Sequence, residues 1–170
     1  MISGRPYYPH DSYETSYILD RKRGVRAERR FWELMRTEHD ITLKPTDRYC
    51  FYDFADETNN VLIELKRRNI AHNKYKTTLL AYDKIERFEQ YNRQNGGKYR
   101  FIMVFYYNDG IYYFVHSTGY PYQIDKFKRQ DRNDPRDRRK DYVFIPITEL
   151  KPIDSIRSDI QSKLIVVYNT

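Results

Sequence analysis

The sequence predicts an α/β fold in which helices flank a mixed β-sheet. Apolar residues recur at helical spacing over 25–37 and again over 74–94, whereas the segments between and after them are rich in β-branched and aromatic residues. A helix that crosses between two strands of one sheet makes those strands parallel. With 170 residues, the chain is long enough to bury a core without disulfides or structural metal, so we expect one domain over 1–170.

The N-terminal part combines an aperiodic segment with a helix. Residues 1–20 are rich in tyrosine and lack periodicity, which predicts an irregular arm packed on the domain. A helix is expected over 25–37, because its apolar stripe contains Val25, Phe31, Trp32 and Met35. Glu28 stands on that stripe, which is an unusual place for a glutamate.

The middle of the chain reads as strands followed by a second helix. Three short β-rich runs predict strands over 41–43, 49–54 and 61–67. A long helix over 74–94 ends at Gly96 and Gly97, and a strand over 99–106 follows it. This core spans 25–106.

Further strands are expected after the core. Asn108-Asp109-Gly110 predicts a turn into a strand over 111–116, and a last strand is expected over 142–147 before a helix over 154–163. Residues 126–140 hold eight basic and three acidic residues, which predicts a basic loop.

The charge balance favours a polyanionic partner. The chain has 31 basic and 24 acidic residues and a formal charge of +7, which suits nucleic acid or an acidic membrane surface. Cys50 is the single cysteine, which excludes an intramolecular disulfide. No run approaches the roughly 18 apolar residues of a membrane span, so a soluble, intracellular protein is expected.

Three charged residues stand where strands normally carry apolar ones. Asp53 stands inside one apolar run, and Glu64 and Lys66 stand inside another; acids are depleted from strands and are seldom buried without a partner. A turn-forming cluster over 56–60 predicts a hairpin between the two runs.

Strand parity then brings the three side chains together. A two-residue turn at positions 58 and 59 sets Asp53 opposite Glu64, and one at 59 and 60 sets it opposite Lys66. Either register puts all three on one face, with opposite Cβ atoms about 5 Å apart.

This cluster suits a divalent metal. Mg²⁺ prefers hard oxygen ligands, which Asp53, Glu64 and the carbonyl of Leu65 would supply. Lys66 on the same face would contact the attacking water or a phosphate.

The spacing of Asp53, ten further residues and Glu64-Leu65-Lys66 resembles the PD-(D/E)XK nuclease superfamily. The resemblance covers residues 25–106 and implies a restriction-endonuclease-like core in the order αβββαβ, with additional C-terminal strands here. Glu28 matches a glutamate that the leading helix of this superfamily often contributes to the metal site. Tyr52 departs from the motif, whose name has proline at this position.

The resemblance implies a Mg²⁺-dependent nuclease that hydrolyses phosphodiester bonds, with DNA as the favoured substrate and Mn²⁺ able to substitute. Its catalytic residues would be Glu28, Asp53, Glu64 and Lys66. Candidate nucleic-acid contacts are Arg26, Arg30, Arg67, Arg68, Thr77, Tyr82 and Lys84. In this superfamily the long helix after the motif often supplies a further polar residue to the site, and the last three of these residues are the candidates for it.

Two other functions stay open. The fold would also serve as a catalytically inactive nucleic-acid-binding or assembly module, or the 18 tyrosines would form a protein-facing interface. Glu64 and Lys66 would then be a surface pair on an edge strand. The sequence leaves the form of the substrate and a homodimeric state undecided.

Overall fold

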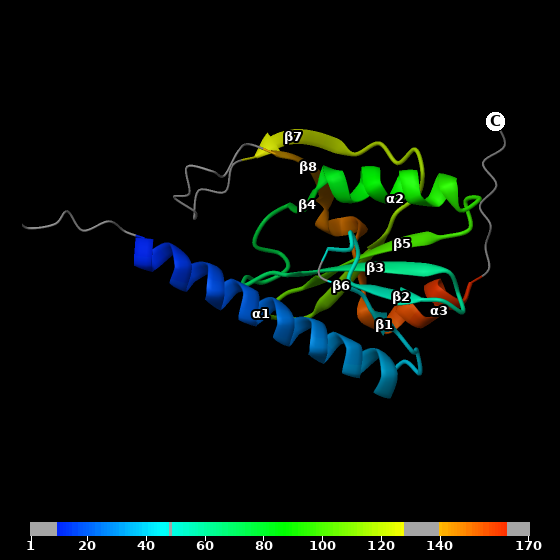
Figure 1. Cartoon of the computed structure of the whole chain (residues 1–170), viewed down its shortest axis with the longest axis horizontal. Coiled ribbons are helices and arrows are strands. Elements are labelled where there is room, and N and C mark those ends of the chain that lie inside the picture. The colour runs from blue at the N-terminus through cyan, green and yellow to red at the C-terminus, as the bar shows by residue number, and fades with distance from the viewer. Residues whose placement is uncertain (1–9, 48, 128–139, 163–170) are drawn as a thin grey trace, which may run out of the picture.

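The computed structural model describes residues 10–47, 49–127 and 140–162, with side chains from residue 18 onward. In this part of the chain, a six-stranded sheet forms the centre and a three-stranded sheet lies beside it (Figure 1). Helices pack on both faces of the larger sheet. The mixed α/β class predicted from the sequence is confirmed.

The larger sheet has the strand order β1-β2-β3-β5-β6-β9. Strands β3 and β5 are parallel, and the other neighbours are antiparallel. The chain crosses from β3 to β5 through a strand and a helix, as a parallel pair requires. The six strands are β1 (Lys44–Pro45), β2 (Phe54–Asp56), β3 (Val61–Arg67), β5 (Arg100–Tyr106), β6 (Ile111–Val115) and β9 (Lys151–Pro152).

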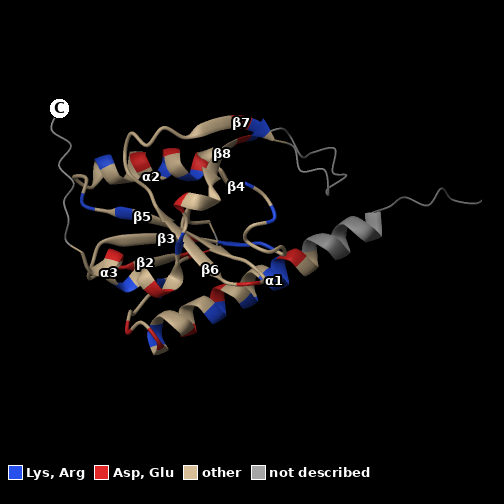
Figure 2. Cartoon of the chain, turned by 180° about the vertical axis from the view of Figure 1, so that it is seen from behind, with Lys and Arg blue, Asp and Glu red and all other residues tan. Residues whose placement is uncertain are grey.

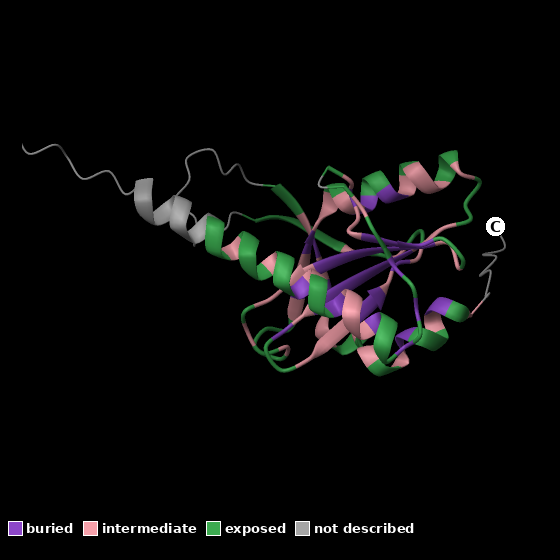
Figure 3. Ribbon diagram, turned by 60° about the horizontal axis from the view of Figure 1, so that its bottom comes forward, coloured by how far each residue is buried: buried purple, intermediate pink, exposed green. Residues whose placement is uncertain are grey.

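Alternate residues of β3 belong to two separate cores. Val61, Ile63 and Leu65 pack with α1 (His10–Thr37) and α3 (Ile156–Gln161) on one face. Leu62 packs on the other face with α2 (Tyr82–Gln94) and the smaller sheet. Figure 3 shows the buried central strands between these layers. Because β3 is apolar on both faces, its limits match the predicted 61–67.

Helix α1 is much longer than the sequence predicted. It begins at His10, so the irregular arm expected over 1–20 is wrong for residues 10–20, while residues 1–9 lie outside the described residues. Its buried stripe is Ala27, Phe31 and Met35, at helical spacing. Val25, assigned to that stripe from the sequence, is 56 % exposed. The N-terminal half of α1 extends past the edge of the sheet (Figure 1).

The first two strands are shorter and later than predicted. Residues 41–43 are not a strand; Ile41 and Leu43 are buried as part of the connection from α1, and β1 begins at Lys44. Residues 49–53 form a bent segment, so β2 begins only at Phe54. Among the described residues, the far half of β3 therefore has no strand partner on the β2 side.

The predicted helix over 74–94 is wrong in its first part. Residues 77–81 form β4 (Thr77–Ala81), and α2 begins at Tyr82. Strand β4 pairs with β8 (Lys140–Pro146), which also pairs with β7 (Gln123–Phe127). Because β4 stands between β3 and α2, the chain order differs from αβββαβ.

The C-terminal part follows the sequence prediction more closely. Strands β5, β6 and β8 lie within two residues of the predicted ranges, and α3 lies inside the predicted helix over 154–163. Most of the predicted basic loop, residues 128–139, lies outside the described residues, and its ends belong to β7 and β8. None of the helices described here has both the length and the apolarity needed to cross a membrane.

Candidate active site

Strand β3 carries Glu64 into the middle of the molecule. Glu64 lies opposite Met103 of β5, and its side chain is 0 % exposed. This burial excludes the surface pair on an edge strand that the sequence left open. A fully buried carboxylate requires compensating partners.

Asp53 reaches Glu64 through the β2–β3 hairpin. Asp56 pairs with Val61, and its carboxylate accepts hydrogen bonds from the backbone and side chain of Asn59 at 3.0 and 2.8 Å. This turn fixes the pairing of Phe54 with Ile63, and one further step along the same register sets Asp53 opposite Glu64. The register predicted for a turn centred on positions 58 and 59 is confirmed.

At Asp53, a side-chain hydrogen bond replaces a backbone hydrogen bond between the two strands of the hairpin. Its backbone N–H still donates to the Ile63 carbonyl at 2.8 Å, but its Oδ2 accepts the N–H of Leu65 at 2.7 Å. The carboxylate thereby supplies the acceptor that a longer β2 would have provided, and it is fixed beside β3.

Two ammonium groups neutralise Glu64. Lys66 Nζ lies 2.5 Å from Glu64 Oε1, and Lys84 Nζ, from the first turn of α2, lies 3.0 Å from the same oxygen. Lys84 also donates to the carbonyl of Phe51 at 3.0 Å. These contacts to Glu64 are ion pairs and not regular hydrogen bonds, and no donor among the described residues reaches the buried Oε2.

Lys84 is one of three residues that the resemblance offered as a further polar group of the site, and it was also assigned to nucleic-acid contact. Its ammonium lies on Glu64. The sequence did not separate Lys84 from Thr77 and Tyr82, because the helix predicted over 74–94 concealed the true start of α2 at Tyr82.

The carboxyl groups of the site are electrostatically strained. Burial and then the charge of Glu64 raise the pKa of Asp53 to about 7, although the Leu65 N–H and Lys66 oppose the shift. Burial also raises the pKa of Glu28; Lys66 opposes this shift and Glu64 adds to it. Burial favours the neutral amine of Lys66, but the charges of Glu64 and Asp53 outweigh it and raise the pKa of Lys66.

The donor set fits a divalent cation in part. The buried, unbonded Glu64 Oε2 and the raised pKa of Asp53 are both features that a cation would relieve. Across the described ranges, however, no three acidic, histidine or cysteine side chains converge as a ready-made cage. Glu28 therefore stands further out than a direct third ligand, and water or backbone oxygen would complete the coordination of Mg²⁺.

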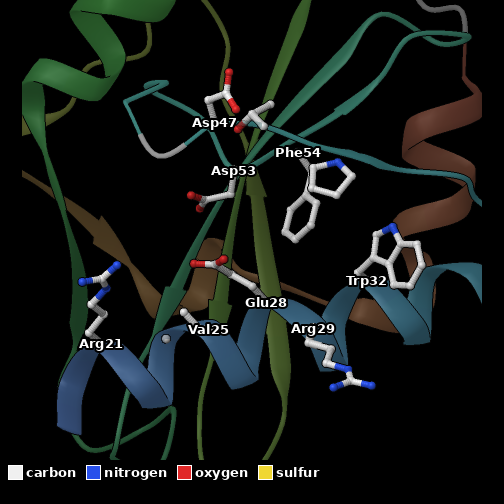
Figure 4. A pocket seen from close by; sticks show the side chains of 11 residues that line it. Arg21, Val25, Glu28, Arg29, Trp32, Asp47, Asp53 and Phe54 are labelled. Atoms are coloured by element: carbon white, nitrogen blue, oxygen red, sulfur yellow. The ribbon is translucent and has the colours of Figure 1, made fainter. Parts of the chain in front are cut away.

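Glu28 and Asp53 line an open cleft of about 700 Å³. We call it the α1 cleft. One wall is α1, with Arg21, Gly24, Val25, Glu28, Arg29 and Trp32; the other is Pro45, Thr46, Asp47, Asp53 and Phe54. Figure 4 shows the carboxylates of Glu28 and Asp53 pointing into the same side of the cleft from opposite walls. The approach of Glu28 to the motif, expected from the sequence, is thus present.

The other predicted nucleic-acid contacts are dispersed. Arg67 donates to the carbonyl of Tyr106 at 2.7 Å and to Asn108 Oδ1 at 2.6 Å, and Arg68 donates to the carbonyl of Leu79. These two arginines tie β3 to its neighbours. The remaining candidates are half-buried on β4 and α2 or exposed on α1: Thr77, Tyr82, Arg26 and Arg30.

The comparison with family models identifies the chain. Residues 10–153 match the model of a family described as "Phage putative PDDEXK endonuclease". The chain belongs to this PD-(D/E)XK family. The resemblance inferred from Asp53, Glu64 and Lys66 is therefore confirmed, and the match extends it from 25–106 to the first part of α1 and to β6, β7, β8 and β9. Comparison of this PD-(D/E)XK chain with curated proteins and with solved structures found no match.

Proposed function

We propose that the protein is a Mg²⁺-dependent nuclease that hydrolyses phosphodiester bonds, with DNA as its substrate. One observation carries the proposal: Asp53, Glu64 and Lys66 meet on one side of the larger sheet at the end of a cleft that Glu28 also lines, in a chain of the PD-(D/E)XK family. The formal charge of +7 supports a polyanionic substrate.

Each residue has a role that its surroundings support. Asp53 and Glu64 Oε2 would hold Mg²⁺, which when bound neutralises phosphate charge and acidifies water. Lys66, with its raised pKa, keeps a proton and donates a hydrogen bond to a phosphate oxygen or to the attacking water. Glu28, whose pKa is also raised, orients a water at the mouth of the cleft. Mn²⁺ would substitute for Mg²⁺ at these oxygen ligands.

A second function is favoured by a specific observation. Lys66 and Lys84 already neutralise Glu64, and the described residues hold no three-carboxylate cage. The same geometry would suit a nucleic-acid-binding module without turnover. Metal binding separates the two, because a module of this kind needs no Mg²⁺.

The test is a cleavage assay with a matched pair of variants. Supercoiled, linear, single-stranded and branched DNA, and RNA, are incubated with the protein in Mg²⁺, in Mn²⁺ and in EDTA. Asp53→Asn should abolish cleavage, whereas Glu57→Gln should retain it, because Glu57 is an exposed acid in the same hairpin that pairs with Lys44. Full activity of Asp53→Asn, or equal cleavage in EDTA, contradicts the assignment.

A further inference from the structure

Two of the arginines of α1 line the α1 cleft and two do not. Arg21 and Arg29 are lining residues. Arg26 and Arg30 are exposed on the same helix but are not among the lining residues. All four carry the same charge, so the two pairs differ in position and not in charge; the basic residues of α1 are blue in Figure 2.

The two cleft arginines are available to a ligand. Arg21 is exposed and reaches along the cleft wall (Figure 4). Arg29 pairs with Glu33 at 3.3 Å, but this pair is exposed on both sides and lies within one helix. Such a surface pair contributes little free energy, so a phosphate readily replaces it.

Gly24 leaves the wall between these arginines bare. It lies in the middle of a helix, where glycine is the least favourable residue except proline. A Cβ added at position 24 would meet no atom within 4 Å, and Gly24 lines the cleft. Packing does not require glycine here, and its effect is to widen the cleft one turn before Glu28.

The part of α1 that lines the cleft is long enough to follow several nucleotides. A rise of about 1.5 Å per residue puts Arg21 about 10 Å from Glu28 along the helix axis. A duplex that lies along α1 advances by about three base pairs over this distance, at roughly 3.4 Å of its axis per base pair. Arg29 lines the same cleft, and its side chain points away from the carboxylates of Glu28 and Asp53 (Figure 4).

We propose that the α1 cleft binds one sugar–phosphate strand of a nucleic acid, which runs along α1 past Gly24. Arg21 and Arg29 each contact a phosphate of this strand from the α1 wall of the cleft. Arg26 and Arg30 do not contact this strand. The inference rests on the proposed function, because it takes nucleic acid as the ligand of the cleft.

The first experiment compares two charge-matched double variants. Arg21→Gln/Arg29→Gln and Arg26→Gln/Arg30→Gln are each made in an Asp53→Asn background, so that the probe stays intact. Fluorescence anisotropy measures the binding of a labelled 15-nucleotide single strand and of the corresponding duplex over a series of salt concentrations. Both variants lose two positive charges, so any difference reports position alone.

The cleft pair should lose more than the control pair. Each lost charged hydrogen bond weakens binding by about tenfold or more, and the slope of log affinity against log salt should fall by about 1.4 for single strands and 1.8 for duplex. The control pair should change affinity by less than about threefold. Equal losses in the two variants, or no binding of either probe, overturn the proposal.

The second experiment uses Gly24→Leu. Leucine favours helix more than glycine does, so the melting temperature should stay the same or rise. The new side chain would occupy the cleft and should weaken probe binding about tenfold or more, with Gln90→Leu, at an exposed position of α2 outside the cleft lining, as the control. Loss of binding with unchanged or higher thermal stability is a result that a folding defect does not give. Unchanged binding contradicts the proposal.

The two proposals fail in different ways. If the wild-type protein cleaves DNA but the two arginine pairs behave alike, the strand path is wrong and the nuclease assignment stands. If no substrate is cleaved but only the cleft pair and Gly24→Leu weaken binding, the strand path stands and the nuclease assignment fails.

Discussion

The carboxylate of Asp53 and the backbone N–H of Leu65 form a 2.7 Å hydrogen bond across the point where β2 gives way to a bent segment. The bond makes one residue both a candidate metal ligand and a part of the sheet. Substitutions at Asp53 therefore affect two properties that can be measured separately.

We expect Asp53→Asn and Asp53→Ala to differ in stability but not in activity. Both remove the charge, so cleavage should fall at least about 100-fold in each. Asparagine retains an oxygen acceptor for the Leu65 N–H, whereas alanine leaves that N–H unpaired at a cost of about 1–3 kcal/mol. Urea unfolding checks this difference, and equal unfolding midpoints would show that the hydrogen bond does not contribute to the stability of the protein.

The raised pKa of Asp53 predicts a pH-dependent stability. In the unfolded chain this carboxyl ionises near 3.8, and in the folded protein near 7, so between these values the folded state binds more protons. The free energy of unfolding should therefore fall as pH rises from about 4 to about 7, by up to about 1.4 kcal/mol per pH unit from this group. Urea unfolding in EDTA at several pH values should show this fall in the wild type. Asp53→Asn should show less of it.

Mg²⁺ should reverse this trend if it binds ionised Asp53. Metal binding to a carboxylate displaces the proton, so the stabilisation by Mg²⁺ should be larger at pH 8 than at pH 6. Thermal unfolding with and without 10 mM MgCl₂ measures it. A Mg²⁺ effect that is the same at both pH values, or is absent, favours the module without turnover.

A double-mutant cycle tests the contact between Glu64 and Lys84. Glu64→Gln and Lys84→Met should each destabilise the protein. The first removes the carboxylate that pairs with the Lys84 ammonium, and the second removes one of the two ammonium groups that pair with the buried Glu64. The double variant should lose less than the sum of the two, with a coupling energy of about 0.5–3 kcal/mol. Purely additive losses would mean that the ammonium acts mainly through the Phe51 carbonyl.

Arg100 is expected to hold the C-terminal helix. Its guanidinium donates to the carbonyl of Ser162 at 2.9 Å and to those of Asp159 and Ile160, which lie near the end of α3. Arg100→Met should release α3 and speed hydrogen exchange over 156–161. Charged hydrogen bonds of this kind contribute about 1.5–3 kcal/mol. Unchanged hydrogen exchange in α3 would contradict this role. Arg87→Met, at an exposed position of α2, serves as the control.

The sequence predicted what depends on neighbours in the chain. The limits of β3 were correct, and the register of Asp53 against Glu64 is one of the two that the sequence left open, because the apolar run and the short turn act locally. The motif residues could be found because charge inside an apolar strand is rare.

Errors arose where distant segments decide the structure. Strand β4 was read as helix because its partner, β8, lies more than 60 residues away, and no local window contains that pairing. The first half of helix α1 was missed for another reason: it extends past the edge of the sheet (Figure 1), and its sequence carries no apolar stripe like the one that predicted the helix over 25–37. The choice of Lys84 among the candidate polar residues depended on the residue at which α2 starts.

Strand β4 leads directly into α2, and α2 packs with residues of β8 in the second core. Lys84 therefore belongs to a layer anchored on the smaller sheet, whereas Glu64 belongs to the larger one. The ion pair between Lys84 and Glu64 therefore connects the two sheets. A displacement of one sheet relative to the other would change the distance between these charges, and with it the charge balance around Glu64, before it disturbed the backbone of either sheet.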